Sequence, residues 1–148
     1  PGEVGLGKGH RILPVTLLWC IIPLLALIFF VTSGQTTFER VANVFVSNFM
    51  QNGFFEEFLF RGALQSRLRR LVSPFWAVVI SALIFGVWHL GLGFSSTGGN
   101  FLTALASTLA YQAFLGLAFG VIFERTRNLV AGSAVHVVLN TFGQVINA

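Results

Sequence analysis

The sequence contains no aspartate, and its charged residues make up only 9% of the chain. A soluble domain carries about 25% charged residues, so water is not the main solvent around this protein. Lysine and arginine outnumber glutamate, giving a net charge of +4, but the sequence lacks the basic, aromatic-rich face on a soluble scaffold that a nucleic-acid reader needs. The composition therefore predicts a membrane protein that contacts anionic lipid headgroups and no nucleic acid.

Cysteine is almost absent as well. The single cysteine, Cys20, lies within an apolar run, where it has no partner for an internal disulfide and no cluster that would bind a metal. We interpret Cys20 as a small packing residue. Disulfide scaffolds and cysteine-based metal sites are thereby excluded as the basis of this fold.

Apolar residues are abundant and occur in long runs. Four runs reach about 20 residues, the helical length that crosses a hydrocarbon core about 30 Å thick, and a fifth segment is less apolar but helical in character. The runs are Ile12–Val31, Phe75–Phe94, Phe101–Phe123 and Leu129–Ala148, and the fifth segment is Phe38–Arg70. Only helices and closed barrels satisfy the backbone in lipid, and no barrel-type alternation is present. The predicted fold class is all-α, an integral membrane bundle of about five helices.

The basic residues predict the orientation of this bundle. If every segment crosses, the basic residues gather on one side and only Arg40 flanks the other, so the positive-inside rule makes the arginine-rich side cytoplasmic. The gathered residues are Lys8, Arg11, Arg67, Arg69, Arg70, Arg125 and Arg127. The glycine-rich stretch Gly91–Asn100 is expected to be an uncharged loop on the opposite side.

The segment Phe38–Arg70 carries an arc of polar side chains that is too broad to face lipid. We expect the arc to face a cavity or other helices. Its members before Glu56 are Asn43, Ser47, Asn48, Gln51 and Asn52. Tyr111 and Gln112 lie in the middle of another apolar run, and we expect them to form hydrogen bonds within the bundle.

Three groups of polar residues lie inside apolar helices, where one charge costs about 2.5–3.5 kcal/mol or more. Glu57 and Arg61 are four residues apart with the acid first, so they share a helix face and can pair. Glu56 points about 100° away and can face a cavity. The groups are Glu56-Glu57-Phe58-Leu59-Phe60-Arg61, Phe85-Gly86-Val87-Trp88-His89 and His136-Val137-Val138-Leu139-Asn140.

Together these groups supply the parts of a hydrolytic site. A carboxylate in apolar surroundings takes up a proton more readily than in water, which suits a general base. One histidine can hold the same water or protonate a leaving amine, while a second histidine and an amide can stabilise an oxyanion. No serine-centred nucleophile motif is evident, so we expect water to attack a peptide or ester carbonyl. Taken singly, each group has a plainer interpretation as a structural ion pair, an interfacial histidine or an interhelical hydrogen bond.

The order EExxxR, FxxxH and HxxxN on separate membrane helices resembles the CPBP family, also called the ABI or CAAX-protease type-II family. The resemblance runs from about Asn48 to the end of the chain. It implies an intramembrane glutamic endopeptidase without a cofactor, in which Glu56 activates water with help from His89. By the same resemblance, the oxyanion hole is His136 and Asn140, and the supporting residues are Glu57, Arg61 and Phe85.

The resemblance also sets expectations for organisation and partners. We expect an N-terminal flank and first transmembrane helix over 1–35 and a CPBP-type protease core over 36–148, with the active site in an intramembrane cavity. Because the family usually has more helices, we expect further helices before Pro1. The expected partners are the bilayer and a membrane-bound peptide or lipidated protein, including prenylated CAAX proteins, in a bacterial or archaeal cell membrane.

Two other hypotheses remain open. Glu56, His89 and His136 match the ligand count of a catalytic zinc site with one open position, although the compact HExxH arrangement is absent. Alternatively, intramembrane acid, histidine and arginine side chains can form an ion or proton path in a non-catalytic immunity or transport protein. Geometry adds a difficulty for any shared site, because straight helices place His89 roughly 10 Å deeper than His136.

Overall fold

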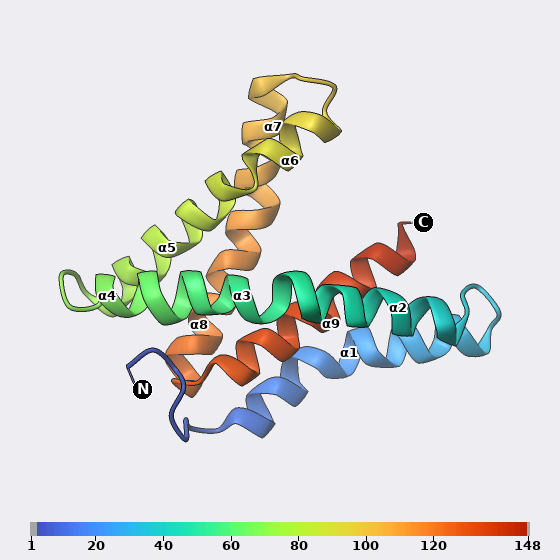
Figure 1. Cartoon of the computed structure of the whole chain (residues 1–148), viewed down its shortest axis with the longest axis horizontal. Coiled ribbons are helices and arrows are strands. Elements are labelled where there is room, and N and C mark those ends of the chain that lie inside the picture. The colour runs from blue at the N-terminus through green and yellow to red at the C-terminus, as the bar shows by residue number, and fades with distance from the viewer. Residues whose placement is uncertain (1–2, 148) are drawn as a thin grey trace.

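The computed structural model describes residues 3–147 and is built from helices. From Phe38 to Leu68 the chain forms one long rod, in which α-helical turns alternate with two π-helical segments (Figure 1). The helices are α1 (Ile12–Thr32), α2 (Phe38–Asn48), η1 (Phe49–Gly53), α3 (Phe54–Glu57), η2 (Phe58–Gln65), α4 (Ser66–Leu68), α5 (Pro74–Trp88), α6 (Leu90–Ser96), α7 (Phe101–Thr108), η3 (Leu109–Ala113), α8 (Phe114–Thr126) and α9 (Leu129–Ile146). No strand occurs within the described range, which confirms the all-α prediction.

Three of these helical stretches are long and apolar enough to cross a membrane by themselves. They are α1, the continuous stretch Phe101–Thr126 and α9. A fourth is α5 together with α6, which are bent by 42° relative to each other. The four predicted apolar runs are therefore confirmed, and the chain is an integral membrane helical bundle.

Polar side chains set several helix starts. The Thr37 hydroxyl accepts a hydrogen bond from the Arg40 backbone N–H at 3.2 Å and caps α2. In the same way, the side-chain oxygens of Asn100 and Asn128 cap α7 and α9. These caps satisfy N–H groups that have no partner inside the helix. The prediction of a loop over Gly91–Asn100 is wrong in its first part, because α6 continues the helix to Ser96 after the bend.

The arginine-rich segments meet at one end of the bundle. Arg69 in the α4–α5 turn forms an ion pair with Glu124 of α8 at 3.0 Å. The N-terminal flank joins them, since the His10 backbone N–H donates to the Thr126 carbonyl and the Asn128 side chain donates to the Gly7 carbonyl, both at 2.6 Å. One end of the molecule thus carries the basic turns, as the predicted orientation requires.

Two arms diverge from this basic end (Figure 1). In one arm, α5 and α6 lie against the stretch α7–η3–α8; in the other, α1 and α2 pack on α9. Small residues let the first arm close tightly, because a Cβ on Gly116 would lie 3.0 Å from the Cα of Ala82. The core beside these contacts includes Phe119, Val135 and the buried Cys20, in agreement with a packing role for the cysteine.

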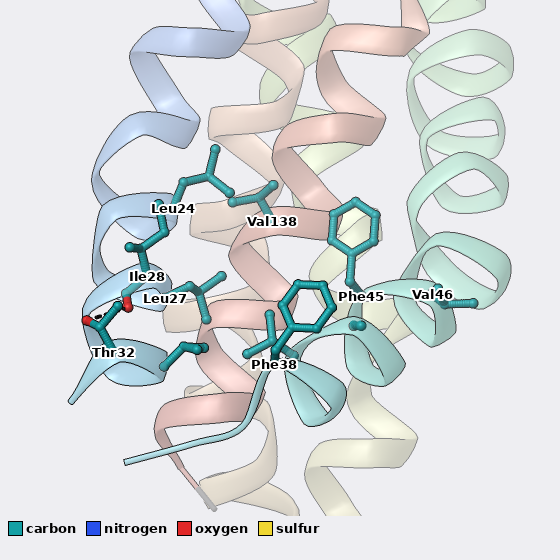
Figure 2. A pocket seen from close by; sticks show the side chains of 11 residues that line it. Leu24, Leu27, Ile28, Thr32, Phe38, Phe45, Val46 and Val138 are labelled. Carbon is teal, nitrogen blue, oxygen red and sulfur yellow. Dashed lines mark hydrogen bonds between the residues drawn. The ribbon is translucent and has the colours of Figure 1, made fainter. Parts of the chain in front are cut away.

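The second arm leaves an apolar groove between α1 and α2 (Figure 2). Its volume is about 410 Å³, and Val138 contributes to it from α9. The one hydroxyl on its wall, that of Thr32, is already bonded to the Ile28 and Phe29 carbonyls. The groove therefore offers no free polar group and suits contact with lipid acyl chains.

Cysteine labelling tests the orientation of the bundle. In a Cys20→Ser background, Gln35→Cys in the α1–α2 turn should react with a membrane-impermeant maleimide in intact cells. Leu71→Cys, which replaces an 80% exposed side chain in the α4–α5 turn, should react only after the membrane is permeabilised, because arginine-rich turns remain cytoplasmic. Labelling of Leu71→Cys in intact cells would show that the bundle has the opposite orientation.

Candidate active site

A polar cavity of about 450 Å³ lies where the two arms face each other. The rod contributes Asn52 and Glu56, the α5–α6 bend contributes His89, and η3 contributes Gln112. The remaining lining residues are Leu92, Tyr111, His136, Asn140, Gly143, Gln144 and Asn147. The structure thus brings the four predicted site residues Glu56, His89, His136 and Asn140 to one cavity.

The Glu56 carboxylate stands between two imidazoles. Its Oε1 lies 3.8 Å from His89 Nε2, and its Oε2 lies 3.7 Å from His136 Nε2. Both separations are too long for a direct hydrogen bond. A water molecule between Glu56 and either imidazole can contact both, so the arrangement suits a bridging water more than a closed ion pair.

The difference in depth expected for straight helices does not keep His89 and His136 apart, since both lie within 3.8 Å of Glu56. Helix α5 ends at Trp88, and α6 restarts at Leu90 at 42° to it. Because His89 Nδ1–H donates to the Phe85 carbonyl at 2.9 Å, the ring is fixed with Nε2 toward Glu56. In the neutral ring this Nε2 is a hydrogen-bond acceptor, so it can take a hydrogen from a water held by Glu56.

Glu57 forms a separate, fully buried charge group behind the cavity. Its Oε1 lies 3.3 Å from Arg61 Nη1 and accepts a hydrogen bond from His136 Nδ1–H at 3.1 Å. The Glu57 side chain is 1% exposed, whereas that of Glu56 is 18% exposed. The prediction that one acid pairs with Arg61 while its neighbour faces a cavity therefore agrees with the structure. The hydrogen bond to His136 is additional.

Arg61 is held from three sides. Its Nη2 donates to the Gly116 carbonyl of α8 at 3.0 Å, and its guanidinium carbon lies 4.7 Å from the Phe85 ring centre and 5.3 Å from that of Phe119. Arginine is suited to such a site because its planar group can stack on rings while it donates hydrogen bonds. Phe85 thus supports the site by contact with both Arg61 and, at 4.6 Å between ring centres, His89.

Two glycines allow the rod and α9 to lie close together beside the Glu57 carboxylate. A Cβ on Gly132 of α9 would lie 2.8 Å from Glu57 Oε2, and one on Gly53 of the rod would lie 2.3 Å from a Val137 methyl. These two glycines let the rod and α9 touch at the level of the charge group. His136 then stacks on Phe119 with ring centres 4.5 Å apart, which fixes its ring plane.

The polar arc of the rod divides into two parts, so the expectation for it was only partly right. Asn48 and Asn52 face α9, where Asn48 bonds to Gln144. Asn43, Ser47 and Gln51 are exposed on the outer side of the rod instead. Tyr111 and Gln112 also depart from expectation, because they line the cavity and their side chains form no hydrogen bond with any residue in 3–147. Sequence reasoning did not single out Gln144 or Phe119.

The residues that could act as metal ligands were compared with the hypothesis of a zinc site. Among residues 3–147, no three histidine, cysteine, aspartate or glutamate side chains come together as a group that could hold a metal ion. The two oxygens of Glu56 face different histidines. The cavity is therefore best described as a carboxylate, two imidazoles and an amide around a space for water.

Removing Arg61 tests the buried charge group. Arg61→Met leaves the Glu57 carboxylate without its main cation, so we expect a loss of about 3–5 kcal/mol in unfolding free energy. The double variant Glu57→Leu/Arg61→Met should recover most of the loss, since it removes both charges. Denaturation in detergent micelles measures both, with the exposed Arg40→Met as the unchanged control. Equal stability of Arg61→Met and the unmodified protein would contradict the pairing.

Comparison with known proteins is consistent with this geometry. A family model described as Type II CAAX prenyl endopeptidase Rce1-like matches residues 18–142. The chain matches no curated protein and no solved structure. Since the matched range covers most of the chain and includes Glu56, His89, His136 and Asn140, this protein belongs to the type II CAAX prenyl endopeptidase Rce1-like family of membrane proteases.

Proposed function

We propose that this protein is an intramembrane endopeptidase in which Glu56 activates the water that cleaves a peptide bond. The observation that carries the proposal is the position of the Glu56 carboxylate, within 3.8 Å of His89 and 3.7 Å of His136 on the wall of a polar cavity. Family membership supports peptidase activity in general. The roles proposed for the individual residues are those that the resemblance of their motifs implies.

The proposed reaction begins with a water held by Glu56 and His89. Glu56 accepts a proton as the water oxygen attacks the carbonyl carbon of the peptide bond, giving a tetrahedral intermediate. His89, whose ring is fixed by the Phe85 carbonyl, accepts the other water hydrogen in a hydrogen bond. The C–N bond then breaks, and the proton passes from Glu56 to the leaving amine, either directly or through His89.

His136 and Asn140 are proposed to stabilise the negative oxygen of the intermediate. Because His136 Nδ1–H already donates to Glu57, its Nε2 can donate only when the ring is protonated. The Glu57 carboxylate, itself paired with Arg61, accepts the hydrogen bond that holds the ring in this orientation. An imidazolium and the Asn140 amide are thus a suitable pair of donors, because both are positioned before the reaction starts.

The position of the cavity supports a proposal for the substrate class. Its walls are parts of membrane helices, so a peptide segment attached to or lying in the bilayer can reach it. We propose membrane-associated peptides or lipidated proteins as substrates, with prenylated CAAX-type proteins among them because of the family match. A bacterial or archaeal cell membrane is the proposed location.

Glu56→Gln tests the central role, because it keeps the side-chain shape and removes the base. Purified protein in liposomes should cleave members of a membrane-anchored peptide library, and Glu56→Gln should lower kcat by about 10²–10⁴-fold. Glu39→Gln, which alters an exposed acid in the first turn of α2, should cleave normally. Full cleavage by Glu56→Gln would rule out the proposed base. Retention of biological activity by that variant would favour the non-catalytic hypothesis.

Metal removal tests the zinc hypothesis on the same substrates. Since residues 3–147 present no assembled ligand group, treatment with a chelator should leave kcat unchanged, and added zinc should not increase it. Metal analysis of the purified protein should find less than one zinc per chain. Activity that disappears with the chelator and returns with zinc would instead support a His₂Glu zinc site.

A further inference from the structure

The cavity continues beyond the proposed catalytic residues along a wall of carboxamides. From Asn140, the lining runs through Gln144 of α9 to Asn147 just past the end of that helix, while Asn52 lies on the rod and Gln112 on η3. This part lies at the end of the bundle away from the arginine-rich turns, because it follows α9 toward its C-terminal end (Figure 1).

Buried Asn48 sets the direction of two of these carboxamides. Asn48 is 2% exposed, and its Nδ2 donates to the Val44 carbonyl at 2.9 Å. Its Oδ1 accepts hydrogen bonds from Asn52 Nδ2 at 3.3 Å and from Gln144 Nε2 at 3.2 Å. With their nitrogens turned toward Asn48, Asn52 and Gln144 present their carbonyl oxygens as acceptors. No donor within residues 3–147 occupies either oxygen.

The chemistry of this wall matches a peptide main chain. Each peptide residue carries one N–H donor and one carbonyl acceptor, and carboxamides supply both kinds of partner without charge. Acyl chains would leave these groups without hydrogen bonds, which is costly in the absence of water. From Asn140 to Asn147 the helix rises about 10 Å, which is the length of about three residues of extended chain.

We propose that this carboxamide wall is a subsite for the backbone of an extended peptide, in which Asn52 and Gln144 accept hydrogen bonds from its N–H groups and Asn48 positions both. The inference rests on the proposed function for the identity of the cleaved bond, but the binding itself does not require hydrolysis. The subsite recognises main chain rather than side chains, so substrates can differ in sequence beside the cleavage point.

Backbone N-methylation tests the subsite, because it removes one N–H donor and leaves every side chain in place. The probe is a fluorescent peptide chosen as the tightest binder from the library, measured on the Glu56→Gln protein in liposomes. N-methylation at one of three consecutive residues should weaken binding about fivefold, as expected for one lost hydrogen bond. With Glu56→Gln/Gln144→Leu, binding should already be weaker by a similar factor, and the same methyl group should have no further effect.

Gln51→Leu is the matched control, since it makes the same exchange at an exposed position on the outer side of the rod. It should leave both binding and the N-methyl effect unchanged. Asn52→Leu is the second variant and should cancel the effect at a different residue of the peptide. An N-methyl effect of equal size in all variants, or no peptide binding at all, would overturn the subsite. Binding without cleavage by the unmodified protein would contradict only the proposed function.

Discussion

The structure depends on the neutralisation of Glu57 deep inside the bundle. A lone carboxylate at this depth would be costly, but Arg61 and His136 both contact it, and each comes from a different helical segment. Arg61 is in turn bonded to the Gly116 carbonyl of α8. One buried charge group thereby links the rod to α9 and to α8. The neighbouring Glu56, turned about 100° around the same helix, is left to face the cavity.

Local sequence patterns predicted much of this arrangement. The apolar runs predicted the membrane helices, and the spacing of Glu57 and Arg61 predicted their ion pair. All of these features depend on residues a few positions apart. Contacts between helices were predictable only as a shared cavity, because the register of one helix against another is set by packing over its whole length.

The features that sequence reasoning missed are contacts between helices. Counting along straight helices separated His89 from His136 in depth, whereas both lie within 3.8 Å of Glu56. The hydrogen bond from His136 to Glu57 and the stacking of His136 on Phe119 need the exact positions of three helices. The Asn48 network joins residues 96 apart in the chain. Its sequence signal was only a broad polar arc, in which three of the five residues before Glu56 are exposed.

The central claim is that Glu56 and His89 act on one water as a unit, and a double-variant cycle tests it most directly. The kcat/KM values of Glu56→Gln, His89→Ala and the double variant are compared with that of the unmodified protein on one library peptide. Residues that act as a unit give strongly non-additive losses. We predict that the double variant is no slower than the slower single variant. Losses that multiply, as for two independent groups, would contradict the account.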